Sequence, residues 1–128
     1  MSMGVLESAV MSQMWDRGDE ATVREVRDSL LAADRPVAYT TVLTGLDNLY
    51  RKGFVSRRKA DRAFVYRAVS SREEHAAALM GEALESAERR DDVLLQFVQR
   101  LRPSELEQLR RTIASIEVEV EVARGPEQ

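Results

Sequence analysis

Residues 39–69 determine the fold, and they read YTTVLTGLDNLYRKGFVSRRKADRAFVYRAV. Apolar side chains recur at three- and four-residue steps over residues 39–52, which predicts a helix. Gly53 follows at once and suits the left-handed cap that ends many helices. Two β-prone runs, residues 54–59 and 64–69, then flank residues 60–63 and predict a β-hairpin with a basic tip and first strand. This stretch therefore predicts a helix that leads directly into a basic hairpin.

The predicted helix 39–52 has two chemically different faces. On a wheel of 100° per residue, one face is apolar and carries Tyr39, Val42, Leu43, Leu46, Leu49 and Tyr50. The opposite face carries Thr40, Thr41, Thr44, Asn48, Arg51 and Lys52. This outer face is hydroxylic in its N-terminal half and cationic in its C-terminal half, and Asp47 lies to one side of it. A helix of this kind can pack on a core with one face and meet a polyanion with the other.

Two further helices are predicted before this stretch. Leu6, Val10 and Met14 recur every four residues, and residues 16–19 end this first helix. Residues 22–25, Thr-Val-Arg-Glu, form a capping box that begins a second helix. Three helices followed by a hairpin predict a mainly α fold with a small β-hairpin, a winged helix-turn-helix domain over residues 1–70.

Residues 71–124 are predicted to be helical, and residues 125–128 form a tail. Capping-box patterns at residues 71–74 and 104–107 predict two helix starts, and residues 93–101 form an amphipathic helix between them. From Leu106 to Val120 apolar residues follow heptad spacing. Residues 116–122 also alternate Val and Glu, so helix and strand both remain open there.

The apolar seams of this C-terminal region could pack on the same chain or pair with a second copy. Few partners remain within the chain for a long helical tail, so we favour a homodimer, which also has the two-fold symmetry of a palindromic DNA site. The predicted dimerisation residues are Leu79, Leu94, Phe97, Val98, Leu101, Leu106, Leu109, Ile113 and Ile116.

Composition argues against an enzyme or a metal site. The 128 residues include no cysteine and a single histidine, His75, which we expect at a surface or interface. Neither a phosphate-binding loop nor a dinucleotide-binding glycine motif occurs, so we expect no catalytic residue, metal or cofactor. No apolar run is long enough to insert into a membrane, and we expect a soluble, cytoplasmic protein.

Charge is distributed unevenly along the chain. The net charge is −3, yet residues 35–70 carry eight basic and two acidic side chains. A basic segment within an acidic chain is typical of a nucleic-acid footprint, although a solvated charged surface gives the same pattern. Threonine and asparagine can read base edges in the major groove, and arginine and lysine bind phosphates. The predicted contacts to double-stranded DNA are Tyr39, Thr40, Thr41, Thr44, Asn48, Arg51, Lys52, Arg57, Arg58, Lys59 and Arg62.

Four stretches of the chain are similar to the motifs of a known family. They are residues 6–11 (LESAVM) with Trp15, residues 22–26 (TVREV), residues 38–46 (AYTTVLTGL) and residues 49–55 (LYRKGFV). In order and density they resemble the penicillinase-repressor family, the winged-helix repressors of β-lactamase and methicillin-resistance genes. The resemblance implies a homodimeric repressor whose third helix reads a palindromic operator and whose C-terminal helices form the dimer. In several members, a membrane-bound sensor and protease system cuts the repressor in its dimerisation region.

The chain departs from the family pattern at three points. Asn48 stands where the family commonly has Arg or Lys, which bears on operator preference. Gln96-Phe97 stands at the place of the Asn-Phe bond of cleaved members and is the candidate cleavage site. The copper-responsive branch carries C-terminal cysteines, which this chain lacks.

The function predicted from these observations is repression by a homodimer bound to a palindromic operator, of β-lactam-resistance or related stress genes. Two alternatives stay open. One is a ligand-responsive winged-helix regulator, which needs a pocket that no sequence feature specifies. The other is a winged helix that binds only proteins, and steep salt dependence distinguishes DNA binding from it.

Overall fold

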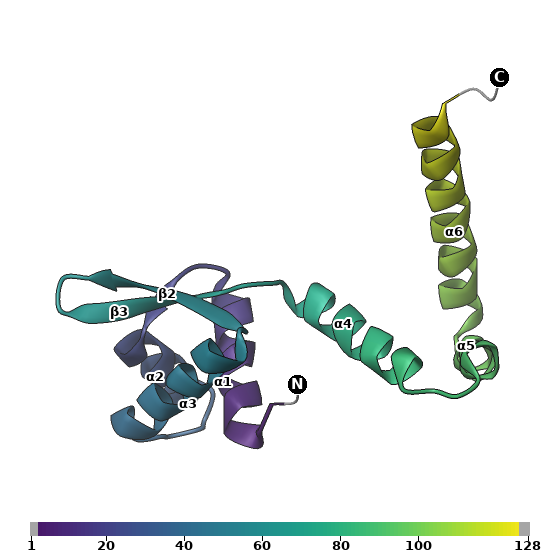
Figure 1. Ribbon diagram of the computed structural model, residues 1–128. Helices are drawn as coiled ribbons and strands as arrows, with labels where there is room; N and C mark the ends of the chain where they lie inside the picture. The colour runs from purple at the N-terminus through teal and green to yellow at the C-terminus, as the bar shows by residue number, and fades with distance from the viewer. Residues whose placement is uncertain (1–2, 126–128) are drawn as a thin grey trace. The chain divides into compact units, whose positions relative to one another are not determined.

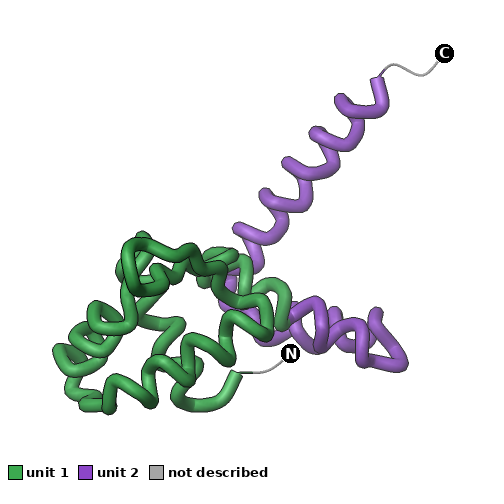
Figure 2. Tube along the Cα trace, turned by 60° about the vertical axis from the view of Figure 1, so that its left-hand side comes forward, with its two compact units in different colours: residues 1–79 green, residues 80–128 purple. Residues whose placement is uncertain are grey.

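The structure is a computed structural model and describes residues 3–125. It divides into two compact units, residues 1–79 and residues 80–128 (Figure 2). The helix α4 begins in the first unit and ends in the second. Among residues 3–125, no helix is both long and apolar enough to cross a membrane.

The first unit has a winged helix-turn-helix fold, as the sequence predicts. Its elements, in chain order, are α1 (Val5–Arg17), β1 (Ala21–Thr22), α2 (Val23–Ala32), α3 (Tyr39–Lys52), β2 (Val55–Ala60) and β3 (Ala63–Ala68). The strands form an antiparallel sheet in the order β1-β3-β2. Figure 1 shows the hairpin of β2 and β3 on one side of the three helices.

The ends of these helices follow from local chemistry. The Thr22 side chain accepts a hydrogen bond from the backbone N–H of Glu25 at 3.2 Å, and Glu25 accepts one from the N–H of Thr22 at 3.0 Å. These two bonds complete the predicted capping box of α2 and lower the pKa of Glu25. Gly18 and Gly53 end α1 and α3 in the left-handed conformation, at φ of 70° and 84°.

A single core joins the three helices to the sheet. Its fully buried side chains are Val10, Met11, Met14, Leu30, Val26, Val42, Leu46, Leu49 and Tyr66. The apolar face of α3 is narrower than the helical wheel suggests. Val42, Leu46 and Leu49 are buried, whereas Tyr39, Leu43 and Tyr50 lie at its edges and remain about 40% exposed.

The hairpin is tighter than predicted. Ala60 pairs with Ala63, so β2 and β3 include the two alanines that the sequence analysis placed in the loop. Only Asp61 and Arg62 form the turn, and Asp61 adopts a φ of 56°, which two-residue hairpin turns require. The predicted strand ends, Phe54 and Val69, lie just outside the ladder.

A short strand, β1, was not predicted. Ala21 pairs with Tyr66, and Thr22 pairs with Val65. Two residues are too few for an alternating pattern, which explains why sequence periodicity gives no sign of this strand. Its role is to fix the start of α2 against the hairpin.

The remaining helices are α4 (Arg72–Glu85), α5 (Arg90–Gln99) and α6 (Pro103–Arg124). Residues 116–122 are helical, which settles the choice that the sequence left open. The predicted cap at residues 104–107 is wrong. Instead Glu105 accepts a hydrogen bond from the backbone N–H of Arg102 at 2.9 Å, because Pro103 occupies the first helical position, where its missing N–H costs nothing. Ser71 and Glu74 do cap each other as predicted, at 3.0 and 3.1 Å, which lowers the pKa of Glu74.

Two glycines in and beside α3 should respond in opposite ways to alanine. Gly45 is buried in the helix, and a Cβ there would lie 3.6–3.7 Å from Leu6 and Val10, an ordinary contact distance. Gly45→Ala should therefore stabilise the fold by about 0.5–1 kcal/mol through helix propensity. Gly53→Ala should destabilise it by about 1–2 kcal/mol because its φ is positive. Chemical denaturation of both variants measures the change in the free energy of unfolding. Changes of the same sign in both variants would contradict this account of the helix.

Candidate nucleic-acid interface

The outer face of α3 presents small polar side chains to solvent. Thr40, Thr41 and Thr44 are exposed, and Asn48 is half-buried one turn further along. The Thr44 hydroxyl donates to the carbonyl of Thr40 at 2.9 Å, which leaves its oxygen able to accept a further hydrogen bond. The N-terminal half of this face carries no charged side chain, and its small side chains allow the helix to approach a DNA groove closely.

Asp47, the one acid of α3, interacts with two arginines. Its Oδ2 lies 2.8 Å from Arg51 on the next turn, and its Oδ1 accepts a hydrogen bond from Arg57 of β2 at 3.3 Å. The Arg51 side chain remains 74% exposed, so its charge is still available to a ligand. Asp47 thus carries a charge that its neighbours on α3 and β2 compensate.

Arg57 has the most enclosed guanidinium of the predicted DNA contacts. Its Cζ lies 4.0 Å from the ring centroid of Tyr50 and 4.2 Å from that of Phe64. The side chain is only 24% exposed, against 74% for Arg51. The ring contacts and the ion pair with Asp47 hold Arg57 between α3 and the hairpin.

The other basic residues of the hairpin differ in their partners. Arg58 donates to Glu20 at 3.0 Å, and this hydrogen bonding lowers the pKa of Glu20 below its ordinary value. Lys59 and Arg62 are exposed, and within residues 3–125 neither side chain makes a hydrogen bond or an ion pair. These two side chains are the most available cations near the hairpin turn.

Lys52 and Tyr39 lie at the two ends of α3. The Lys52 ammonium donates to both carboxylate oxygens of Glu7 in α1, at 2.8 and 2.9 Å, and both side chains are partly buried. Tyr39 begins the helix, with the Arg27 guanidinium 6.0 Å from its ring. Lys52 therefore ties α3 to α1, a contact that links positions 45 residues apart and that no local pattern reveals.

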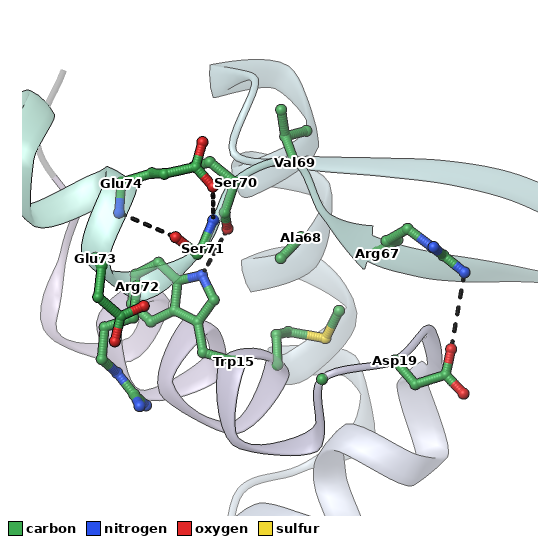
Figure 3. Close-up of a pocket in the computed structure, with 12 residues that line it drawn as sticks. Trp15, Asp19, Arg67, Ala68, Val69, Ser70, Ser71, Arg72, Glu73 and Glu74 are labelled. Carbon is green, nitrogen blue, oxygen red and sulfur yellow. Dashed lines mark hydrogen bonds and ion pairs between the residues drawn. The ribbon is translucent and has the colours of Figure 1, made fainter. Parts of the chain in front are cut away.

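The junction between β3 and α4 holds a cluster that the sequence analysis missed. A cavity of about 430 Å³ lies there, and Figure 3 shows Trp15 and Arg67 among its lining residues. The Trp15 indole donates to the carbonyl of Ser70 at 3.0 Å. His75 packs against Trp15 and Phe54, with ring centroids 5.3 and 5.4 Å apart. The histidine therefore belongs to an aromatic cluster that holds the start of α4 on α1.

The predicted dimerisation residues lie on the helices that have no buried side chains among residues 72–124. Leu79, Leu94, Phe97, Leu106, Ile113 and Ile116 are each between 38% and 52% exposed. Val98, Leu101 and Leu109 are half-buried. The heptad seam of α6 is thus an apolar stripe whose residues, apart from the half-buried Leu109, are exposed in the single chain.

Within residues 3–125, no group of three or more His, Asp or Glu side chains could hold a metal ion. The pKa shifts of acids belong to residues that cap helices or pair with arginine, such as Glu25 and Glu20.

Known proteins resemble this chain over most of its length. The profile of the penicillinase repressor family matches residues 3–115. Two curated proteins from Mycobacterium tuberculosis, both called transcriptional regulator BlaI, are 42% identical over 118 residues, which is 90% of this chain and 85% of theirs.

Solved structures also resemble the chain. MepR, a transcription regulator of the Staphylococcus aureus multidrug efflux pump MepA, is 18% identical, with a TM-score of 0.44 over 94% of this chain and 82% of its own. RosR of H. salinarum is 12% identical, with a TM-score of 0.49 over 94% of this chain and 97% of its own. The family profile and the 42% identity together decide the classification: the chain belongs to the penicillinase repressor family of transcriptional regulators.

Proposed function

We propose that this protein represses transcription in the cytoplasm by binding, as a homodimer, to a two-fold symmetric DNA operator. The observation that carries the proposal is the outer face of α3, which presents three exposed threonines and the exposed charge of Arg51. Lys59 and Arg62 add two available cations beside it on the hairpin. A major groove admits one helix, and the phosphates on its borders suit these cations.

The dimer in this proposal is formed by the C-terminal helices. Apolar residues at heptad spacing on α6 stay exposed in the single chain, and a second copy of the same stripe can bury them. Two-fold pairing gives the dimer two α3 helices, related by the same symmetry as the two halves of an inverted repeat. Half-site centres should then lie one helical turn apart, about 34–36 Å, or a multiple of that distance.

Selection of bound sequences from a random DNA pool tests the proposal directly. The expected result is an inverted repeat with the half-site spacing given above. A protein that enriches no sequence, or only a single half-site, would contradict it. Inverted repeats upstream of β-lactam-resistance genes are the first natural sites to assay.

Substitutions on α3 and the hairpin should separate base reading from phosphate binding. Thr44→Ala and Asn48→Ala should each weaken binding to the best operator by roughly 1–3 kcal/mol and relax preference at particular base pairs. Arg62→Ala should weaken binding to all sequences more evenly. Binding measured against a panel of single-base operator variants distinguishes the two effects. If Asn48→Ala kept the base preference and Arg62→Ala altered it, the assigned roles would be reversed.

Repression is proposed to end when a regulatory protease of a sensor system cuts the chain at Gln96-Phe97. This bond lies inside α5, and a protease needs locally extended backbone, so cleavage requires opening of the helix. A cut there would separate the winged unit from α6. Mass spectrometry of the protein from induced cells should find fragments that end at Gln96. Intact chains alone, while target transcripts rise, would point to a ligand or another partner.

A further inference from the structure

We propose that Arg57 is a positioning residue that fixes the hairpin relative to α3 and makes no contact with DNA. This inference rests on the proposed DNA binding and changes the role of one residue that the sequence analysis placed among the phosphate contacts. Its consequence is a fixed spacing between the base-reading side chains of α3 and the phosphate-binding Lys59 and Arg62.

Three elements meet at this one guanidinium. Arg57 belongs to β2, and its two ring contacts come from Tyr50 of α3 and Phe64 of β3, at 4.0 and 4.2 Å. Its hydrogen bond to Asp47, at 3.3 Å, reaches α3 a second time. In the ladder Arg57 lies opposite Tyr66, two residues from Phe64, so Arg57 and Phe64 share the face of the hairpin that meets α3. A planar cation between two aromatic faces is held in direction as well as in place.

Moving Arg57 to a phosphate would forfeit these contacts. The guanidinium would leave both ring faces and the carboxylate of Asp47 for one new partner. Arg51 would then be the only arginine on Asp47, beside the face that meets a polyanion. Lys59 and Arg62 are exposed and have no such contacts to lose within the described residues 3–125. Lys59 and Arg62 are therefore the hairpin residues that bind phosphates, and Arg57 remains between Tyr50 and Phe64.

Conservative substitution separates the two roles. Lysine keeps the charge that a phosphate contact needs, but it lacks the planar fork that fits between the rings and onto Asp47. Arg57→Lys in the full-length protein should therefore weaken operator binding about tenfold, close to the effect of Arg57→Ala. The matched control Arg62→Lys should retain most of the affinity. Arg57→Lys with wild-type affinity would overturn the proposal. Circular dichroism at the assay temperature confirms that the variants compared are folded.

Substitution of Asp47 gives a second test, because a phosphate contact and a positioning role of Arg57 predict opposite changes in operator affinity. Removing an acid beside the DNA should tighten binding if Arg57 and Asp47 act only through their charges. If Asp47 holds the positioning residue, Asp47→Asn should weaken binding. The double variant with Arg57→Ala should then be no weaker than Arg57→Ala alone. Tighter binding by Asp47→Asn, or additive losses in the double variant, would overturn the proposal.

Nuclear magnetic resonance reports the contact itself. Protons of a side chain held over aromatic faces shift upfield, so the Arg57 side chain should show this shift in the free protein and keep it with operator bound. Loss of the shift on binding would overturn the proposal. Failure of the wild-type protein to bind any two-fold DNA is a separate result: it refutes the proposed function, and the shift in the free protein still tests the contact with Tyr50 and Phe64.

Discussion

Raising the salt concentration from 50 to 200 mM should weaken operator binding by about 10³-fold. Each subunit brings at least three exposed cations to the proposed surface, Arg51, Lys59 and Arg62, and the proposed dimer has twice their number. Each phosphate neutralised releases condensed counterions, which makes the affinity fall steeply with salt. Fluorescence anisotropy titrations at several salt concentrations measure the slope.

Matched variants give this experiment its control. Arg62→Ala should make the slope of log affinity against log salt shallower by about 2 in the dimer, one contact in each subunit. Arg111→Ala removes the same charge from α6, where the side chain is exposed and lies off the heptad seam, and should leave the slope unchanged. Association insensitive to salt would indicate a winged helix that binds proteins in place of DNA.

Disrupting the α6 seam should lower operator affinity by about 10²–10⁴-fold. Ile113→Glu places a charge in the apolar stripe and should convert the dimer to a monomer. Each winged unit then binds its half-site alone and loses the effective concentration that the linked partner supplies. Sedimentation velocity measures the oligomeric state, and anisotropy with the same operator measures the affinity.

Val118→Glu is the matched control for this prediction. It introduces the same side chain into the same helix, at a position that is 62% exposed and lies on the side away from the seam. It should leave both the dimer and the affinity as they are. A monomeric wild-type protein, or equal effects of the two variants, would show that the α6 seam does not form the dimer.

The helices and the hairpin were predictable because their signals are local. Thr22 and Glu25 are three residues apart and cap α2 by themselves, and Gly53 marks the end of α3 through its own backbone preference. The exposed face of α3 follows from helical periodicity alone. The resemblance to the penicillinase repressors, carried by four longer motifs, added what periodicity and caps could not, the family to which this chain belongs.

The partners of the basic residues could not be predicted, because they depend on tertiary contacts. Lys52, Arg57 and Arg58 look alike in sequence, as basic residues of one segment. In the fold they bind Glu7, Asp47 and Glu20, which lie 45, 10 and 38 residues away. Only the packing of α1 and α3 and of the hairpin shows which charges are engaged and which remain available.

The aromatic cluster at the start of α4 contains a natural fluorophore, so the intrinsic fluorescence of the protein can report on this cluster. Trp15 is the single tryptophan of the chain, and its indole lies 5.3 Å from the imidazole of His75. Indole emission depends on the groups packed against the ring, so the fluorescence of this one side chain reports whether the first turn of α4 stays on α1. The chain has no cysteine, so a thiol-reactive dye can be placed at any chosen position without a competing site. Detachment of α4 and the proposed operator binding can thus be followed in one cuvette, at separate wavelengths.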